Sequence, residues 1–229
     1  MQREINTYTQ TGTLDSVQHR VLRNTYWLLG LSLIPTVIGA LVGINMSFAF
    51  MAASPILSSL LFLGAIYGLF FAIEANKYST VGVYLLLALT FVMGVMLGPL
   101  LQFTLAFRNG GQLITLAAGG TAAVFFTLAG IASTTKRDFS GMANFLTVGA
   151  IVLMIAVVAN IFLRLPMLQL VLCGGFMLFS SLMILFNVNQ IVRGGETNYI
   201  TATLSLYMNI YNIFVSLLEI LGIFGGDRR

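Results

Sequence analysis

The chain has 229 residues, of which 58% are hydrophobic and 8% are charged, with a formal net charge of +4. Soluble domains carry roughly 25% charged residues, so this composition excludes a soluble globular domain and indicates a chain that lies in the lipid bilayer. The Lys and Arg residues are scattered over short loops, which favours a role in membrane orientation and excludes a nucleic-acid partner.

The first 23 residues are polar, and they include Arg3, Glu4, Asp15, His19 and Arg20. This segment is too polar and too long for the leader of a signal peptide, and the apolar run behind it has the length of a membrane span. We therefore expect residues 1–23 to form a polar cytoplasmic tail that stays attached to the first span. Within it, residues 1–18 contain few large apolar side chains, so we expect them to be disordered.

Seven apolar runs of about 20 residues follow the tail, each long enough to cross a bilayer. They lie near residues 24–43, 52–73, 80–101, 113–132, 142–163, 167–186 and 199–224. The sequence thus predicts an all-α membrane protein, with a seven-helix transmembrane domain over residues 24–224 and a short tail at 225–229.

The distribution of Lys and Arg predicts the orientation of these spans. With the amino terminus inside, seven of these residues lie on the cytoplasmic side and four on the other side. If the last run only enters the bilayer and returns, Arg228 and Arg229 also move inside. The amino terminus is therefore expected in the cytoplasm, and the side of the carboxyl terminus stays open.

Small residues recur four positions apart in the first four spans, a spacing that lets helix backbones approach closely. The pairs are Gly39 with Gly43, Gly64 with Gly68, Gly94 with Gly98, and Gly119 with Ala123. We expect these pairs to pack against neighbouring helices. A flexible hinge at Gly98 and Pro99 is the alternative.

The last apolar run carries polar residues at helical spacing, within an arc of about 80°. This polar stripe consists of Thr201, Ser205, Asn209, Asn212, Ser216 and Glu219. An unsatisfied polar group in hydrocarbon is costly, so the stripe should face other helices or water, with the last helix inside the bundle.

The sixth span has a weaker polar face, made of Gln169, Cys173, Ser180 and Asn187. One interpretation is that the two polar faces hydrogen-bond helix to helix and hold the bundle together. The other is that they line a polar cavity or an ion path. Both interpretations stay open.

The segment "RGGETNY" separates these last two helices. Gly194 and Gly195 are expected to end the sixth helix, and Thr197 or Asn198 to cap the next one. Glu196 could pair with Arg193 in this turn, and a catalytic role for Glu196 is less favoured.

An enzyme is not expected, because the residues that most catalytic sites need are missing from the spans. His19, the only histidine, lies in the tail, and all three aspartates lie outside the apolar runs. Cys173 is the only cysteine, so neither a disulfide within the chain nor a cysteine-based metal cage can form. We expect no catalytic, cofactor or metal site. Glu219 is the one acid well inside an apolar run, and its place near the far interface favours a solvated side chain.

Three stretches carry a resemblance to a known family. The run "GGETNYITATLSLYMNIYNIFVSLLEILG", with "HRVLRNTYWLL" and "ANIFLRLP", resembles the transmembrane Bax inhibitor motif (Bax inhibitor-1) family, and within it the bacterial YccA-type inner-membrane proteins. The resemblance implies six helices around a seventh, the last. It also implies an inner-membrane protein that modulates the membrane-anchored AAA protease FtsH and its partners HflK and HflC.

Other members of that family act as pH-sensitive calcium leaks, with two aspartates in the last two helices that share a proton. The positions that match these aspartates are Asn187 and Asn209 here, and an amide does not titrate. Three hypotheses therefore stay open: a modulator of a protease, a bundle that conducts or binds calcium or protons, and a structural membrane protein.

Overall fold

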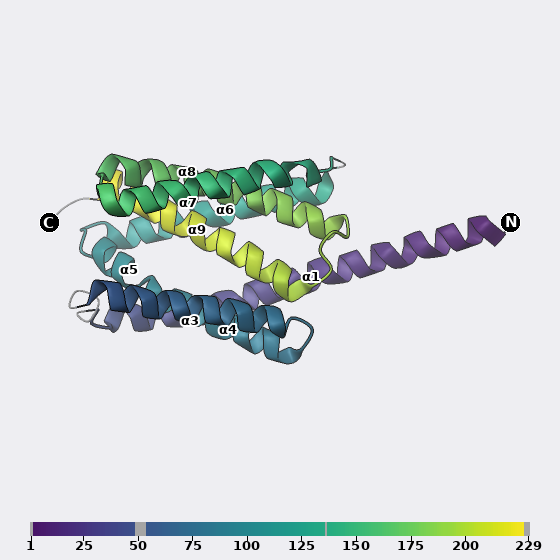
Figure 1. Cartoon of the computed structure of the whole chain (residues 1–229), viewed down its shortest axis with the longest axis horizontal. Coiled ribbons are helices and arrows are strands. Elements are labelled where there is room, and N and C mark those ends of the chain that lie inside the picture. Colours follow the sequence, from purple (N-terminus) through teal and green to yellow (C-terminus); the bar gives the residue numbers. More distant parts are fainter. Residues whose placement is uncertain (1, 49–53, 136, 227–229) are drawn as a thin grey trace. The chain divides into compact units, whose positions relative to one another are not determined.

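The computed structural model describes residues 2–48, 54–135 and 137–226, and within these ranges it contains helices and no strand (Figure 1). This confirms the prediction of an all-α protein. The helices are α1 (Gln2–Asn45), α3 (Pro55–Ala75), α4 (Thr80–Met96), α5 (Gly98–Leu105), α6 (Gly110–Thr134), α7 (Ala143–Leu163), α8 (Pro166–Val192) and α9 (Tyr199–Gly225), with a short 3₁₀ turn, η1 (Ser140–Met142), before α7.

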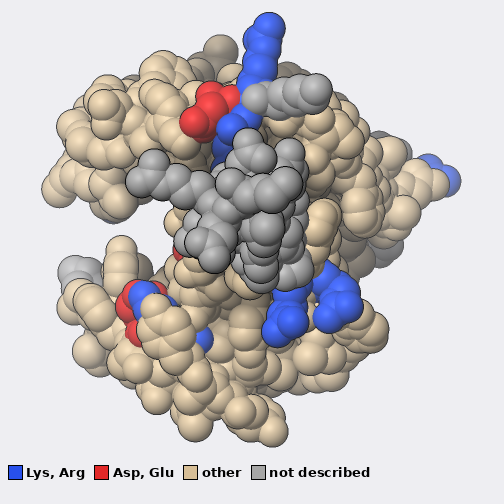
Figure 2. Space-filling model, turned by 90° about the vertical axis from the view of Figure 1, so that its right-hand side faces the viewer, with Lys and Arg blue, Asp and Glu red and all other residues tan. Residues whose placement is uncertain are grey.

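Six helical segments of the described chain are long and apolar enough to cross a membrane. They are Val17–Asn45, Thr80–Leu105, Gly110–Thr134, Ser140–Leu163, Pro166–Val192 and Tyr199–Gly225. The face of the molecule in Figure 2 is accordingly mostly uncharged, with Lys, Arg, Asp and Glu confined to a few places. The chain is thus a multi-pass membrane protein.

The predicted spans at 52–73 and 80–101 differ from the helices observed there. Helix α3 covers most of the first, but its apolar part within the described side chains, Leu60–Ala75, is shorter than a span, so the count of seven stays a prediction. The second run is divided into α4 and α5 at Leu97. Pro99 lacks the N–H that would continue the ladder, so a break forms at this point.

The described chain forms two compact units. The first contains the residues up to Trp27 together with Thr121–Ser216, and the second contains Leu28–Gly120 with the residues after Ser216. Helices α1, α6 and α9 each contribute residues to both units.

In the second unit, α1 and α4 approach each other through glycines. A Cβ added at Gly39 would lie 2.2 Å from the carbonyl oxygen of Phe91, and one at Gly94 would lie 2.2 Å from that of Thr36. Since any side chain would push the two backbones apart, only glycine permits this approach. A Cβ at Gly43 would meet the Val95 carbonyl oxygen at 2.4 Å, which confirms the packing prediction for the first span.

The third-span pair is confirmed as well, because a Cβ at Gly98 would lie 2.6 Å from the carbonyl oxygen of Gly43. The prediction is wrong for Gly64, Gly68 and Gly119, where a Cβ would meet no described atom within 4 Å.

The side-chain amide of Gln102 connects α5 to the end of α1 through hydrogen bonds. Its Nε2 donates to the carbonyl oxygens of Gly43, Ile44 and Met46 at 3.1, 2.9 and 2.9 Å, groups that a helix end leaves without helical partners.

In the first unit, α7 and α8 run side by side and antiparallel (Figure 1). The start of the first span is held by α6 and α9: the ring of Tyr26 meets that of Phe125 edge to face at 6.1 Å, and the hydroxyl of Thr203 donates to the carbonyl oxygen of Thr25 at 3.2 Å.

The tail differs from the expectation of disorder, because α1 already begins at Gln2. The segment from residue 2 to residue 21 contains no proline and a single glycine, Gly12. Once the first span has formed, each further helical residue adds a backbone hydrogen bond without a new nucleation cost. The helix therefore extends outward from the span.

Helix α9 has no exposed residue between Tyr199 and Gly222. Two residues of its polar stripe are buried, Asn209 at 6% exposure and Ser216 at 5%, and the other four are half-buried. A polar stripe in an apolar helix requires such shielding from lipid.

The close contact between α1 and α4 at their glycines leads to a testable prediction. We expect Gly94→Ala to destabilise the protein by about 1–3 kcal/mol, because the methyl group overpacks a backbone contact. Gly68→Ala, at an open position in the same unit, should change stability by less than about 1 kcal/mol. Thermal unfolding in detergent measures both. Equal effects of the two variants would contradict the close approach of α1 and α4.

Candidate functional site

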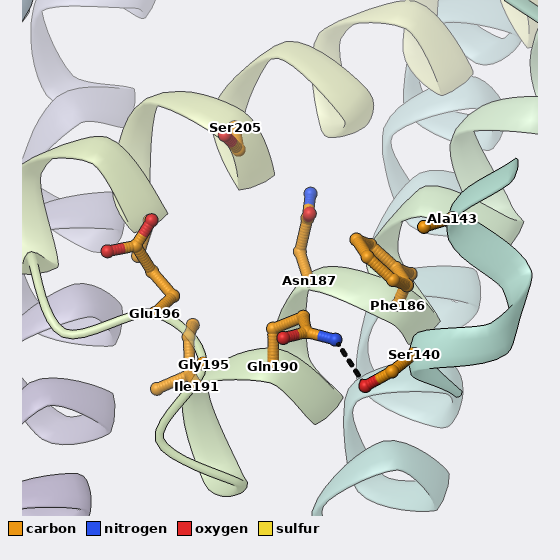
Figure 3. A pocket seen from close by; sticks show the side chains of 10 residues that line it. Ser140, Ala143, Phe186, Asn187, Gln190, Ile191, Gly195, Glu196 and Ser205 are labelled. Atoms are coloured by element: carbon orange, nitrogen blue, oxygen red, sulfur yellow. Dashed lines mark hydrogen bonds between the residues drawn. The ribbon is translucent and has the colours of Figure 1, made fainter. Parts of the chain in front are cut away.

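A cavity of about 390 Å³, lined by both polar and apolar residues, lies in the first unit beside the end of α8 and the start of α9 (Figure 3). The residues around it come from η1, from the first residue of α7, from α8, from the turn after α8 and from the start of α9. They are Ser140, Ala143, Phe186, Asn187, Gln190, Ile191, Gly195, Glu196, Ala202 and Ser205.

The turn that borders the cavity is fixed by the end of α8. Gly194 has a φ of +78° and donates its N–H to the carbonyl oxygen of Ile191 at 3.2 Å, and Gly195 donates to that of Gln190 at 2.8 Å. These two bonds form the Schellman arrangement, which supplies donors to the last carbonyls of the helix. The prediction that the two glycines end the helix is confirmed.

The next helix is capped as the sequence predicts. The side chain of Asn198 accepts hydrogen bonds from the backbone N–H groups of Ile200 at 2.9 Å and Thr201 at 3.1 Å, so Asn198 is the N-cap of α9. Glu196 accepts from the N–H of Asn198 at 2.7 Å, and this bond orients its half-buried carboxylate.

Arg193 pairs with Asp138. The Nε of Arg193 lies 4.0 Å from Oδ1 of Asp138. The carboxylate of Asp138 also accepts from the backbone N–H of Ser140 at 2.8 Å. The bonds from Ser140 lower the pKa of Asp138 below its ordinary value, and the charge of Arg193 adds to this effect. The two segments beside the cavity are thus joined at an exposed charge pair.

Asn189, which the sequence reasoning missed, anchors the segment before α7. This fully buried side chain accepts from the N–H of Phe139 and donates to the carbonyl oxygen of Arg137, each at 3.1 Å. Its neighbour Gln190 donates to the hydroxyl of Ser140 at 2.9 Å (Figure 3). The sequence does contain a hint of this contact in the irregular segment before α7. The backbone N–H and C=O groups of such a segment need hydrogen-bond partners from elsewhere in the protein.

The polar faces of α8 and α9 meet at the cavity without bonding across it. In Figure 3, Asn187 projects from α8 into the cavity, with Ser205 on α9 facing the same space. Its buried Nδ2 has no hydrogen-bond partner in the described protein, and neither do the hydroxyls of Ser180 and Thr201. The amide of Asn209 donates instead to the carbonyl oxygen of Ser205 in its own helix, at 2.7 Å.

These bonds bear on the interpretation that the two polar faces hydrogen-bond helix to helix. Asn187 and Asn209 do not bond to each other, and no hydrogen bond in the described chain joins Ser180 or Asn187 to α9. An amide can bond to the carbonyl of its own preceding turn, and Asn209 does so. An unpaired buried donor costs about 1–3 kcal/mol, and Nδ2 of Asn187 is such a donor although its residue borders the cavity.

The remaining residues singled out by the sequence lie away from this cavity. Gln169 is exposed at the opposite end of α8, where its Oε1 accepts from the amide of Asn160 at 2.9 Å. Cys173 is buried in α8. Asn212 and Ser216 lie further along α9, and Glu219 belongs to the second unit. The structure therefore brings together only Asn187, Ser205 and the turn at 194–196.

The chemistry available in the cavity is that of one carboxylate, Glu196, with two hydroxyls and two amides. Within the described residues, no three His, Cys, Asp or Glu side chains lie close enough to hold a metal ion together. The cavity can hold water and small polar groups. It lacks the pair of close carboxylates that would share a proton.

Comparison with known proteins places these features in context. The model of a family described as inhibitor of apoptosis-promoting Bax1 matches residues 18–226. An Escherichia coli protein named modulator of FtsH protease YccA is 44% identical over 91% of this chain and 92% of its own. An uncharacterized protein of Neisseria meningitidis is 46% identical over 92% of this chain and 93% of its own. An uncharacterized membrane protein of Vibrio cholerae is 40% identical over 96% of this chain and 97% of its own.

The Asn189 anchor can be tested by substitution. We expect Asn189→Leu to lower the free energy of unfolding by about 1–3 kcal/mol, because Phe139 N–H and the Arg137 carbonyl lose their partner. Trypsin should then cleave faster after Arg137. Gln190→Leu, which removes only a bond to the exposed Ser140, serves as the control and should cost less. If both variants resist trypsin like the parent protein, Asn189 does not hold the segment.

A second prediction concerns proton-gated calcium flux. Two amides keep no charge that changes with pH, and a hard cation loses two carboxylate ligands. We expect calcium flux into proteoliposomes to be small and nearly flat between pH 6 and pH 8. The double variant Asn187→Asp with Asn209→Asp should introduce pH dependence.

The control for that experiment is Glu196→Gln, which removes the one carboxylate of the cavity. It should leave the small flux of the parent protein unchanged. A steep pH-dependent calcium flux in the parent protein would contradict the prediction, and its loss in Glu196→Gln would assign the titration to that residue.

Proposed function

Because the chain belongs to the family described as inhibitor of apoptosis-promoting Bax1, we propose that it is an inner-membrane protein that binds the AAA protease FtsH and modulates its activity. The observation that carries the proposal is the 44% identity to the Escherichia coli protein named as a modulator of this protease. The matched region extends over about nine-tenths of both chains.

The proposed topology places the amino terminus in the cytoplasm. The excess of Lys and Arg on that side supports this orientation, and it puts the segment around Asp138 and the turn at Gly194 on the cytoplasmic side as well. Both segments border the cavity, and both carry exposed charged groups. They offer a polar surface near the tail, where a membrane-anchored protease could make contact.

The same proposal includes seven spans, with α9 surrounded by the other six. Two observations support it. Helix α3 has 21 residues, which is the length of a span, and α9 exposes no residue between Tyr199 and Gly222. The HflK and HflC proteins, which the family resemblance associates with FtsH, are proposed as further partners of the complex.

An ion leak of the family type is the less favoured alternative. It would need titrating groups on the last two helices, where this chain has Asn187 and Asn209. The cavity beside Asn187 keeps a polar space of about 390 Å³ but contains the single carboxylate of Glu196. This arrangement suits a hydrated polar pocket better than a proton-sharing latch.

Co-purification tests the proposal. From membranes solubilised in mild detergent, we expect the tagged chain to retain FtsH, HflK and HflC at least about fivefold above a tagged multi-pass membrane protein of similar size. Removal of residues 2–16 should reduce the recovery of FtsH, because the tail is the longest polar segment that a protease could engage. A variant with the same residues in scrambled order controls for length.

Recovery of FtsH no higher than with the unrelated membrane protein would contradict the proposed function. Recovery that is high and unaffected by the deletion would keep the partner but exclude the tail as the contact.

A further inference from the structure

A second, shallow recess opens on the surface of the first unit, where α1 enters the apolar part of the chain. Its volume is about 620 Å³, and its described lining residues, His19, Arg20, Leu22, Arg23 and Tyr26, all belong to α1. None of these described residues is acidic. Two guanidinium groups thus border the recess.

The spacing of these residues along the helix places them on one face. Arg20, Arg23 and Trp27 follow one another at intervals of three and four residues, so their side chains project from the same side of α1. Both arginines are exposed, and the indole of Trp27 is 75% exposed. A basic group therefore stands directly above an aromatic one along the helix.

The depth of this face in the bilayer follows from the sequence. Arg23 is the last charged residue before an uncharged stretch that runs to the end of α1 at Asn45. Tryptophan is enriched where lipid headgroups meet the hydrocarbon, and arginines just outside a span lie at the level of the phosphates. The recess consequently opens at headgroup level, with Trp27 at the boundary below it.

The arginines at the recess differ from Arg193 of the same unit in the charges that surround them. Arg193 stands beside the carboxylate of Asp138, which offsets its charge, whereas the described residues that line the recess on α1 are basic or neutral.

We propose that this recess binds the phosphate group of an anionic phospholipid from the surrounding leaflet. The two guanidinium groups can donate forked hydrogen bonds to one phosphate, and the exposed indole of Trp27 can contact the glycerol and the first carbons of the acyl chains. A free phosphate would share the first interaction but not the second. The inference does not depend on the proposed function.

Native mass spectrometry of the full chain in detergent tests the proposal, with phosphatidylglycerol as the probe. We expect phosphatidylglycerol to bind at least about tenfold more tightly than phosphatidylcholine, and the double variant Arg20→Gln with Arg23→Gln to lose most of this difference. Arg20→Lys with Arg23→Lys, which keeps the charge, should retain part of it.

The matched control is Arg137→Gln with Arg193→Gln, which removes two positive charges from the same unit and should leave the preference intact. The thermal midpoint without added lipid identifies any variant that is merely unfolded. Equal binding of the two lipids, equal loss in the control, or displacement of the lipid by millimolar glycerol phosphate would each overturn the lipid site. The last result would assign the recess to soluble phosphates.

Discussion

The bilayer core contains no water, and this constraint governs the structure: every buried polar group must find a partner inside the protein or in a cavity that water can reach. The backbone meets the requirement by forming helices, and the helix ends meet it one by one. Gly194 and Gly195 supply donors to the end of α8, Asn198 accepts from the start of α9, and Gln102 donates to the end of α1. The exceptions among the described residues include Asn187, which borders the cavity, and Ser180 and Thr201, which do not line it.

Two kinds of contact hold the helices together. In the second unit, α1 and α4 come together through glycines, since lipid supplies no hydrophobic drive between helices and close van der Waals contact has to replace it. In the first unit, amide side chains connect segments that the helices cannot reach, and Asn189 is the clearest case. The cavity of the first unit presents hydroxyl, amide and carboxylate groups with which a ligand or partner could bond.

Much of the fold follows from local patterns in the sequence. Apolar runs predicted the helices, Gly194 and Asn198 predicted how α8 ends and α9 begins, and Gly94 predicted a close helix contact. Spacing alone could not separate Gly94 from Gly68, because both occur in the same pattern and only the neighbouring helix decides which one packs. The cavity was harder to predict from the sequence. The stripe on α9 identified Ser205, but the cavity also depends on Ser140 and Gln190, which meet across 50 positions of the sequence through a contact that no local period reveals.

The most direct test of the central claim is proteolysis in a defined membrane. FtsH would be reconstituted in liposomes with this chain or with an equal amount of an unrelated multi-pass protein, and the degradation rate of a membrane-protein substrate would be measured while ATP hydrolysis is followed in parallel. If the chain modulates the protease, the degradation rate should change with its concentration and reach a plateau at a fixed ratio to FtsH. A degradation rate that stays the same at every ratio, with the chain folded and inserted, would contradict the claim.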